Sequence, residues 1–199
     1  MEEYVRLSMT RDEVRSAKHA IIGCRPYFER ISLGFAARLL WVRDTLKEDH
    51  LVLDELDYLE GLRAAGETKE EEQFEHPPLY PFWHKHWSAP RHIARNVGIR
   101  WALDKTGNRD LTKTMGRIAK DHGDDPDRWQ PALVYELVID GYFSRRAARR
   151  ITGDWIVFAR HGGKNYYLDL ATHDEGKDPA ALYLKLRRGS QAEFPLLFE

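Results

Sequence analysis

Hydrophobic and polar residues alternate in two short stretches near the C-terminus, on either side of a glycine pair. The stretches 155–161 and 166–172 are rich in β-branched and aromatic residues. Gly162 and Gly163 between them allow the positive φ angles that a tight turn requires. The pattern therefore predicts an antiparallel hairpin over about 155–172.

The pairing of the two strands follows if the two glycines form the whole turn. The predicted pairs are His161 with Lys164, Ala159 with Tyr166, Val157 with Leu168 and Trp155 with Leu170. These residues share one face, which we expect helices to cover. The other face carries Ile156, Phe158, Arg160, Asn165, Tyr167, Asp169 and His173. It is either a half-solvated face with cross-strand polar pairs or an active or binding surface.

Apolar residues recur at steps of three and four along most of the remaining chain, which predicts helices. The first helix follows a capping box, Thr10 to Glu13, and ends at about Gly23. The further helices are expected at about 26–48, 50–64, 89–106, 110–122, 131–143 and 179–188. The segment 131–143 is long enough for a helix, although its β-branched residues would also allow a strand.

The order of these elements predicts an α+β fold, in which a helical N-terminal half precedes a short antiparallel sheet flanked by helices. Residues 1–65 form a helical bundle region in this interpretation. Residues 66–90 form an acidic linker and an aromatic, proline-rich loop. Residues 91–199 form an α+β C-terminal part, unless the whole chain is one domain.

Composition excludes several classes of protein. The 199 residues are 42% hydrophobic and 32% charged, which is typical of a globular protein. We expect no membrane association, because no apolar run approaches the ~20 residues of a membrane helix. The single cysteine and the acidic, polar N-terminus favour a reducing cytoplasm without a secretory signal. Phosphate-binding glycine motifs are missing, so we expect no cofactor.

Charge is distributed unevenly although the net charge is only −1. Acidic residues dominate 42–75, whereas basic residues dominate 145–164. The basic residues are Arg145, Arg146, Arg149, Arg150, Arg160 and Lys164. Such a cluster favours contacts with nucleic-acid phosphates, or else pairs with the acidic segment.

Histidines gather in the aromatic segment. His84 and His86 point the same way if the chain is extended there, so they are candidate metal ligands as well as candidate catalytic groups. With nine histidines in 199 residues, chance alone yields about 0.4 His-x-His pairs, so the pair is a weak signal. A structural or surface role for both imidazoles is therefore the leading alternative.

Metal-independent ribonucleases need an acid or base, a cation for the phosphate and a positioning group. We assign phosphate binding to Arg160 and Lys164, acid–base chemistry to His173 or His84, and substrate positioning to Tyr167. This set resembles small bacterial toxin nucleases in architecture, and it predicts a ribonuclease-like hydrolase of the toxin or phage-defence kind.

A non-enzymatic role is the alternative. The aromatic loop 79–87 would then bind a protein partner through Trp83 and Trp87. The acidic stretch 67–75 would guide that partner electrostatically.

Overall fold

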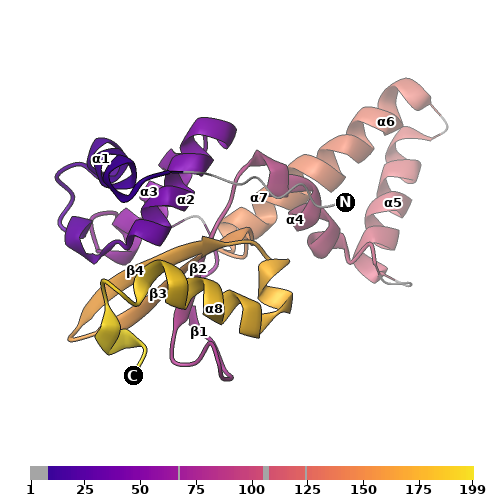
Figure 1. The fold of residues 1–199 in the computed structure, drawn as a ribbon. Coiled ribbons are helices and arrows are strands. Elements are labelled where there is room, and N and C mark those ends of the chain that lie inside the picture. Colours follow the sequence, from indigo (N-terminus) through magenta and orange to yellow (C-terminus); the bar gives the residue numbers. More distant parts are fainter. Residues whose placement is uncertain (1–8, 67, 105–107, 124) are drawn as a thin grey trace. The chain divides into compact units, whose positions relative to one another are not determined.

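The computed structural model describes residues 9–66, 68–104, 108–123 and 125–199. The chain forms two compact units, seen in Figure 1. Unit 1 comprises Met1–Ala65, Glu71–Trp87 and Asp154–Glu199, and unit 2 comprises Gly66–Glu70 and Ser88–Gly153. The predicted α+β class is confirmed, because a helical N-terminal part precedes an antiparallel sheet flanked by helices. Glu67, in the predicted acidic stretch, lies outside the described residues.

The helices that begin unit 1 are α1 (Arg11–Ile22), η1 (Phe28–Arg30), α2 (Leu33–Trp41), the π-helical η2 (Val42–Leu46) and α3 (Asp49–Leu59). The capping box between Thr10 and Glu13 is confirmed. The prediction that a second helix begins near Pro26 is wrong. The backbone is extended at Ile31, and α2 begins after Ser32, whose hydroxyl accepts a hydrogen bond from the Phe35 amide.

The sheet contains β1 (Glu72–Gln73), β2 (Trp83–Trp87), β3 (Asp154–His161) and β4 (Lys164–Ala171), all antiparallel in that order. The predicted loop 79–87 is therefore wrong over its second half, which forms an inner strand. Pro77, Pro78 and Pro81 precede this strand and interrupt nothing within it.

The hairpin β3–β4 has the predicted two-glycine turn, with φ of 56° at Gly162 and 72° at Gly163. The pairs of His161 with Lys164 and of Ala159 with Tyr166 are confirmed. Beyond them the predicted pairing is wrong, because the register shifts between Phe158 and Val157. Tyr167 pairs with Phe158 and Asp169 pairs with Val157, so Leu168 is an extra residue, a β-bulge.

The bulge leaves the Leu168 carbonyl outside the ladder, and two buried hydroxyls satisfy it. Ser32 Oγ donates to this oxygen at 2.6 Å and Ser190 Oγ donates to it at 2.9 Å. The two serines belong to segments from opposite layers, which meet closely at glycines. A Cβ atom added to Gly34 would come within 2.9 Å of the Gly189 Cα, so α2 and α8 cross where neither has a side chain.

Both faces of the sheet are buried. The helices α2 and α3 cover one face, with α1 packed on α2, and η5 (Glu175–Lys177), α8 (Pro179–Ser190) and η6 (Pro195–Leu197) lie on the other (Figure 1). The predicted half-solvated face is wrong, because Ile156, Phe158 and Tyr167 are fully buried and Asp169 is 4% exposed. Tyr167 packs against Tyr27 and Phe35, which a sequence pattern confined to the hairpin does not reveal.

Unit 2 contains η3 (Pro90–His92), α4 (Ile93–Trp101), α5 (Arg109–His122), α6 (Pro126–Val134), the π-helical η4 (Tyr135–Asp140) and α7 (Gly141–Ala147). The helical prediction for 131–143 is confirmed, because α6, η4 and α7 follow one another without an extended residue. The Trp101 indole donates to the Leu137 carbonyl at 2.8 Å, and its ring leaves no room for a Cβ at Gly141.

Ser144 lies inside α7 and its hydroxyl donates to the Gly141 carbonyl. The helix ends at Ala147, and Arg149 adopts a left-handed φ of 51°. None of the helices in the described part of the chain has both the length and the apolar content needed to cross a bilayer.

Candidate active site

Strand β2 places two imidazoles on one face of the sheet. His84 pairs with Val157 and His86 pairs with Trp155, so both histidines share the face that α8 lies on. Their ring centroids are 5.6 Å apart. Lys85, between them, points to the other face and forms a buried ion pair with Glu55 of α3 at 3.3 Å. Because this ion pair holds Lys85 on the α3 side of the sheet, His84 and His86 must point to the face that α8 lies on.

The turn after β4 brings a third imidazole to the same place. The His173 ring stacks on the His86 ring, with centroids 5.3 Å apart and planes inclined by 29°. A local capping box holds this turn, because the Thr172 amide donates to the Glu175 carboxylate and the Glu175 amide donates to the Thr172 hydroxyl. His84, His86 and His173, which we call the histidine cluster, therefore come from two segments far apart in the sequence.

Trp155 is the centre around which the cluster is arranged. Its ring centroid lies 4.9 Å from His84, 6.3 Å from His86 and 5.0 Å from His173. Phe74 packs edge-on against Trp155 at 5.7 Å and also contacts His84 at 4.7 Å. A Cβ atom at Gly176 would overlap the Trp155 ring. The indole is thus enclosed by imidazoles, a phenyl ring and a backbone that only glycine permits.

The three histidines of the cluster differ in solvent access. His86 is 4% exposed, whereas the His84 side chain is 13% exposed and His173 is half-buried. His84 Nε2 lies 4.0 Å from Glu72 Oε2, at the exposed strand β1. The partly exposed imidazoles of His84 and His173 thus flank the buried His86, although the Nδ1 atom of His84 and the Nε2 atom of His173 are themselves buried.

A network of four charges adjoins the turn that carries His173. Lys185 Nζ contacts Glu175 at 2.7 Å and Asp169 at 3.7 Å, and Arg38 contacts the same two carboxylates at 3.5 and 3.9 Å. Burial raises the pKa of Asp169 against the attraction of both cations. Burial also acts to raise the pKa of Glu175, but Lys185, the Thr172 amide and Arg38 outweigh it and lower that pKa.

The arrangement does not match a metal site. Among the described residues, no group of three or more His, Cys, Asp or Glu side chains is placed to hold a metal ion. What the histidine cluster offers instead is proton transfer. Imidazoles both accept and donate protons near neutral pH, so two accessible ones can supply a base and an acid.

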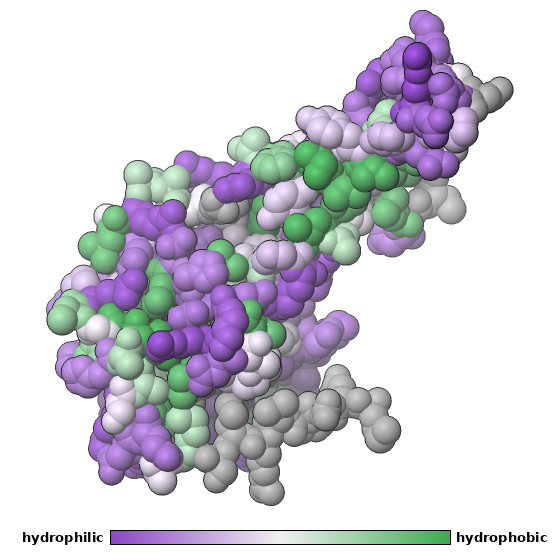
Figure 2. Space-filling model, turned by 90° about the horizontal axis from the view of Figure 1, so that it is seen from above, coloured by the Kyte–Doolittle hydropathy of each residue, from purple (hydrophilic) through white to green (hydrophobic). Residues whose placement is uncertain are grey.

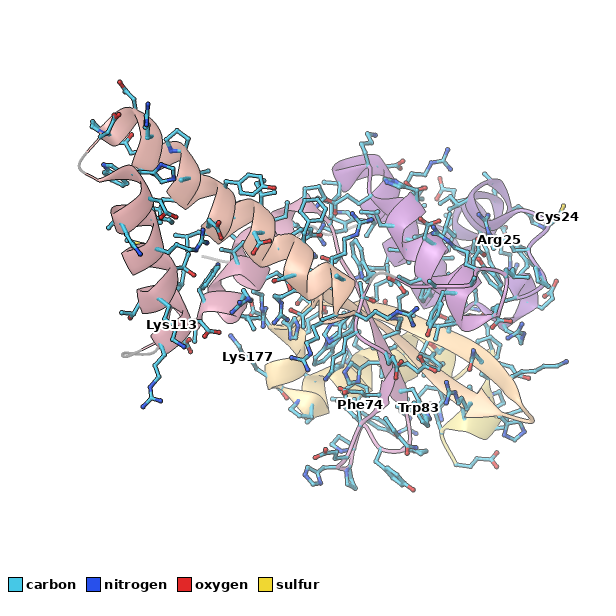
Figure 3. All side chains as sticks on the ribbon, turned by 180° about the vertical axis from the view of Figure 1, so that it is seen from behind. Cys24, Arg25, Phe74, Trp83, Lys113 and Lys177 are labelled. Carbon is cyan, nitrogen blue, oxygen red and sulfur yellow. The ribbon has the colours of Figure 1, made fainter. Side chains whose placement is uncertain are left out.

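Arg160 does not join the histidine cluster. Its guanidinium lies over the Trp83 ring at 4.0 Å and forms an ion pair with Glu71 at 2.8 Å. Figure 3 shows Trp83 and Phe74 in the β1–β2 region of the sheet. Lys164 is exposed at the turn beside Gly163. Both cations therefore lie toward the turn end of the hairpin.

Tyr167 lies on the face opposite the histidines and is part of a different network. Its hydroxyl donates to Glu60 at 2.7 Å, and Arg30 holds both oxygens of the same carboxylate at 2.8 and 2.5 Å. Burial and the Glu60 carboxylate raise the pKa of Tyr167. The phenol thus satisfies a half-buried ion pair, which is a structural role.

The basic segment lies in unit 2. Arg146, Arg149 and Arg150 are exposed, whereas Arg145 is partly buried. The Arg145 side chain donates to Asn96 Oδ1 at 3.3 Å and also to the Arg150 carbonyl. Burial, and after it the charges of Arg150 and Arg100, lower the pKa of Arg145.

The aromatic segment is mostly unavailable to a partner. Trp87 is 2% exposed, and Leu79 and Phe82 belong to the core that α8 covers. Trp83 is half-buried, stacks on Phe158 at 6.4 Å and is covered by the Arg160 guanidinium. Of these aromatic side chains, Tyr80 is the exposed one.

Sequence reasoning missed Trp155 and the buried position of His86. The signal was present in the residues Trp83 to Trp87, where aromatic residues and histidines alternate with period two. An inner strand there would have paired His86 with Trp155. Comparison of the chain with protein-family models, with curated proteins and with solved structures finds no match.

Proposed function

We propose that the protein cleaves RNA without a metal ion and that the histidine cluster carries the acid–base chemistry. The observation that supports this proposal is the convergence of His84, His86 and His173 around Trp155. His84 and His173 are the partly exposed members, so they are the catalytic residues of the proposal. His86, which contacts both and is buried, is a positioning residue.

The reaction balances with these groups alone. One imidazole accepts the proton of the ribose 2′-hydroxyl, and the 2′-oxygen forms a bond to phosphorus as the bond from phosphorus to the 5′-oxygen breaks. The other imidazole, protonated, gives its proton to the leaving 5′-oxygen. The products are a 2′,3′-cyclic phosphate and a free 5′-hydroxyl end, so the product ends identify the mechanism.

Affinity for RNA would come from the basic segment of unit 2. Three exposed arginines, Arg146, Arg149 and Arg150, supply phosphate contacts that do not depend on sequence. The chain's one cysteine, Cys24, is exposed and free, which suits a reducing compartment. A toxin or phage-defence effector acting in the cytoplasm is the biological role that fits such an activity.

The test is cleavage of a mixed-sequence RNA in the presence of a chelator. We expect cyclic-phosphate ends, and a loss of about 10²–10⁴-fold in rate for His84→Gln and for His173→Gln. His76→Gln is the matched control, because His76 is exposed and lies outside the cluster. Unchanged cleavage in both cluster variants, or cleavage that requires a metal ion, refutes the proposal.

Binding is tested separately by salt titration. Replacing Arg146, Arg149 and Arg150 by alanine should reduce the slope of log affinity against log salt by about 2, since each phosphate contact contributes about 0.7 for a single strand. Arg11→Ala/Arg188→Ala removes two exposed charges from unit 1 as a control.

The alternative role as a protein-interaction module through Trp83 and Trp87 has less support. Trp87 is buried in the sheet and Trp83 is covered by Arg160. A partner would have to displace sheet packing to reach Trp87 and the Arg160 guanidinium to reach Trp83, which costs more than an exposed aromatic anchor requires.

A further inference from the structure

Unit 2 exposes more large apolar side chains than it buries. Among its described residues, the large apolar side chains that are fully buried are Val97, Trp101, Ile118 and Ile151. The exposed ones are Ile99, Leu103, Met115, Val134, Tyr135, Val138, Ile139 and Phe143. A small unit with so few buried groups has a marginal core, and association is a common way to complete one.

Five of the exposed residues form a continuous stripe on one helical run. Val134, Tyr135, Val138, Ile139 and Phe143, which we call the apolar stripe, follow steps of about four residues through α6, η4 and α7. A π-helix has close to 4.4 residues per turn, so residues at this spacing stay on one side. Figure 2 shows apolar side chains gathered in a band on the helices of unit 2.

The opposite side of the same run is already occupied. The Leu137 carbonyl accepts the Trp101 indole, and Gly141 packs against that ring. A surface helix normally turns polar residues outward, whereas this run is apolar on both sides. Tyr135 is 61% exposed and Val134 is 59% exposed. Such a patch marks an interaction surface.

Charge along the run indicates which partner covers the stripe. Exposed Asp127 stands at its beginning, beside an ion pair of Asp125 with Arg128 at 3.4 Å, and the basic segment Arg145–Arg150 stands at its end. If the helical run of a second copy lies antiparallel on the first, the acidic beginning of each run faces the basic end of the other. The two copies then make two such contacts. A two-fold axis generates this arrangement, because it makes each surface its own complement.

We propose that two copies of this chain associate through the apolar stripe, with their helical runs antiparallel and the two-fold axis near Val138 and Ile139. The stripe of one copy covers the stripe of the other. Asp127 at the beginning of each run then faces the basic segment of the other copy, which Arg150 ends beyond the end of α7 at Ala147.

Sedimentation equilibrium of the full chain tests this proposal. We expect a dimer, and we expect Val138→Asp/Ile139→Asp to be monomeric at concentrations where the wild type is dimeric. Leu184→Asp is the control, because Leu184 is at least as exposed as Val138 and Ile139 but lies on α8 in unit 1. Circular dichroism verifies that each variant is folded. A monomeric wild type at ~100 µM, or a dimer that the stripe substitutions leave intact, overturns the proposal.

Charge reversal tests the antiparallel arrangement. We expect Asp127→Arg and Arg150→Asp each to weaken self-association about fivefold, the combined effect of the two symmetry-related exposed ion pairs of the dimer. The double variant should recover most of the loss, because the reversed charges again meet opposite partners. A double variant that associates more weakly than either single one excludes this pairing, and with it the proposed axis.

Discussion

Replacing Tyr167 by phenylalanine separates a structural role for the phenol from a catalytic one. The change removes one oxygen and the 2.7 Å hydrogen bond to Glu60, and it leaves the buried ring in place. A hydrogen bond to a charged group contributes about 1.5–3 kcal/mol. Arg30 still holds both oxygens of the Glu60 carboxylate, so the variant has no uncompensated buried charge. The expected loss of unfolding free energy is therefore about 2 kcal/mol.

Replacing Arg30 should give the largest loss of unfolding free energy among the three variants compared. Arg30→Met leaves the Glu60 carboxylate, 11% exposed, without its cation, and breaking such a pair costs about 3–5 kcal/mol. Tyr166→Phe is the control, and it should give the smallest loss of unfolding free energy. The Tyr166 ring packs on Phe194 at 5.3 Å, and in the described part of the chain its hydroxyl makes no comparable bond. Urea unfolding should order the losses Arg30→Met, then Tyr167→Phe, then Tyr166→Phe.

The loss should also depend on pH in a definite direction. Burial acts to raise the pKa of Glu60, but hydrogen bonds from Arg30 and Tyr167 outweigh it and hold the pKa below its ordinary 4.5. A lowered pKa stabilises the fold above pH 4.5, and this contribution is lost as the pH falls through the folded value. The gap between wild type and Tyr167→Phe should thus be full at pH 7 and narrow in acid. A gap below about 0.5 kcal/mol at pH 7, or one that is constant with pH, would refute the reasoning.

Two further predictions concern groups on either face of the sheet. Lys85→Met or Glu55→Leu alone should lower the free energy of unfolding by about 3–5 kcal/mol, whereas the double replacement should come within ~1 kcal/mol of wild type, because it leaves no lone charge. Equal losses in the single and double variants would argue against a coupled pair. Gly176→Ala should cost about 1–3 kcal/mol through overlap with Trp155, while Gly116→Ala, with open space around it in α5, should stabilise by about 0.5–1 kcal/mol. Thermal unfolding measures both, and a stable Gly176→Ala protein would show that Trp155 is not held by that turn.

Local sequence patterns predicted the elements whose interacting residues lie close together in the sequence. The Thr10–Glu13 capping box, the Gly162–Gly163 turn and the helix over 131–143 all follow from a few adjacent residues. The pairing of β2 with β3 could not be predicted in this way. It joins residues about 70 positions apart, and prolines on both sides of the aromatic segment obscured its period of two.

Burial of the second sheet face could not be predicted from the hairpin either. Asn165, Tyr167 and Asp169 look like a solvated set in sequence, because polar groups on a strand normally face water. In the structure each has partners supplied by helices: the Leu59 carbonyl for Asn165, Glu60 for Tyr167, and Arg38 and Lys185 for Asp169. Those partners are distant in sequence, so the hairpin alone gives no sign of them.

The bulge at Leu168 decides which of the candidate groups meet. In an unbroken register Leu170 would face Trp155, and His173 would share a face with Tyr167. The extra residue moves Ala171 opposite Trp155 instead, so that the chain beyond it carries His173 onto His86. Tyr167, before the bulge, stays with Glu60 on the other face. The same bulge frees the Leu168 carbonyl for Ser32 and Ser190. Because these two hydroxyls hold the bulge open, the position of His173 depends on contacts made on both sides of the sheet.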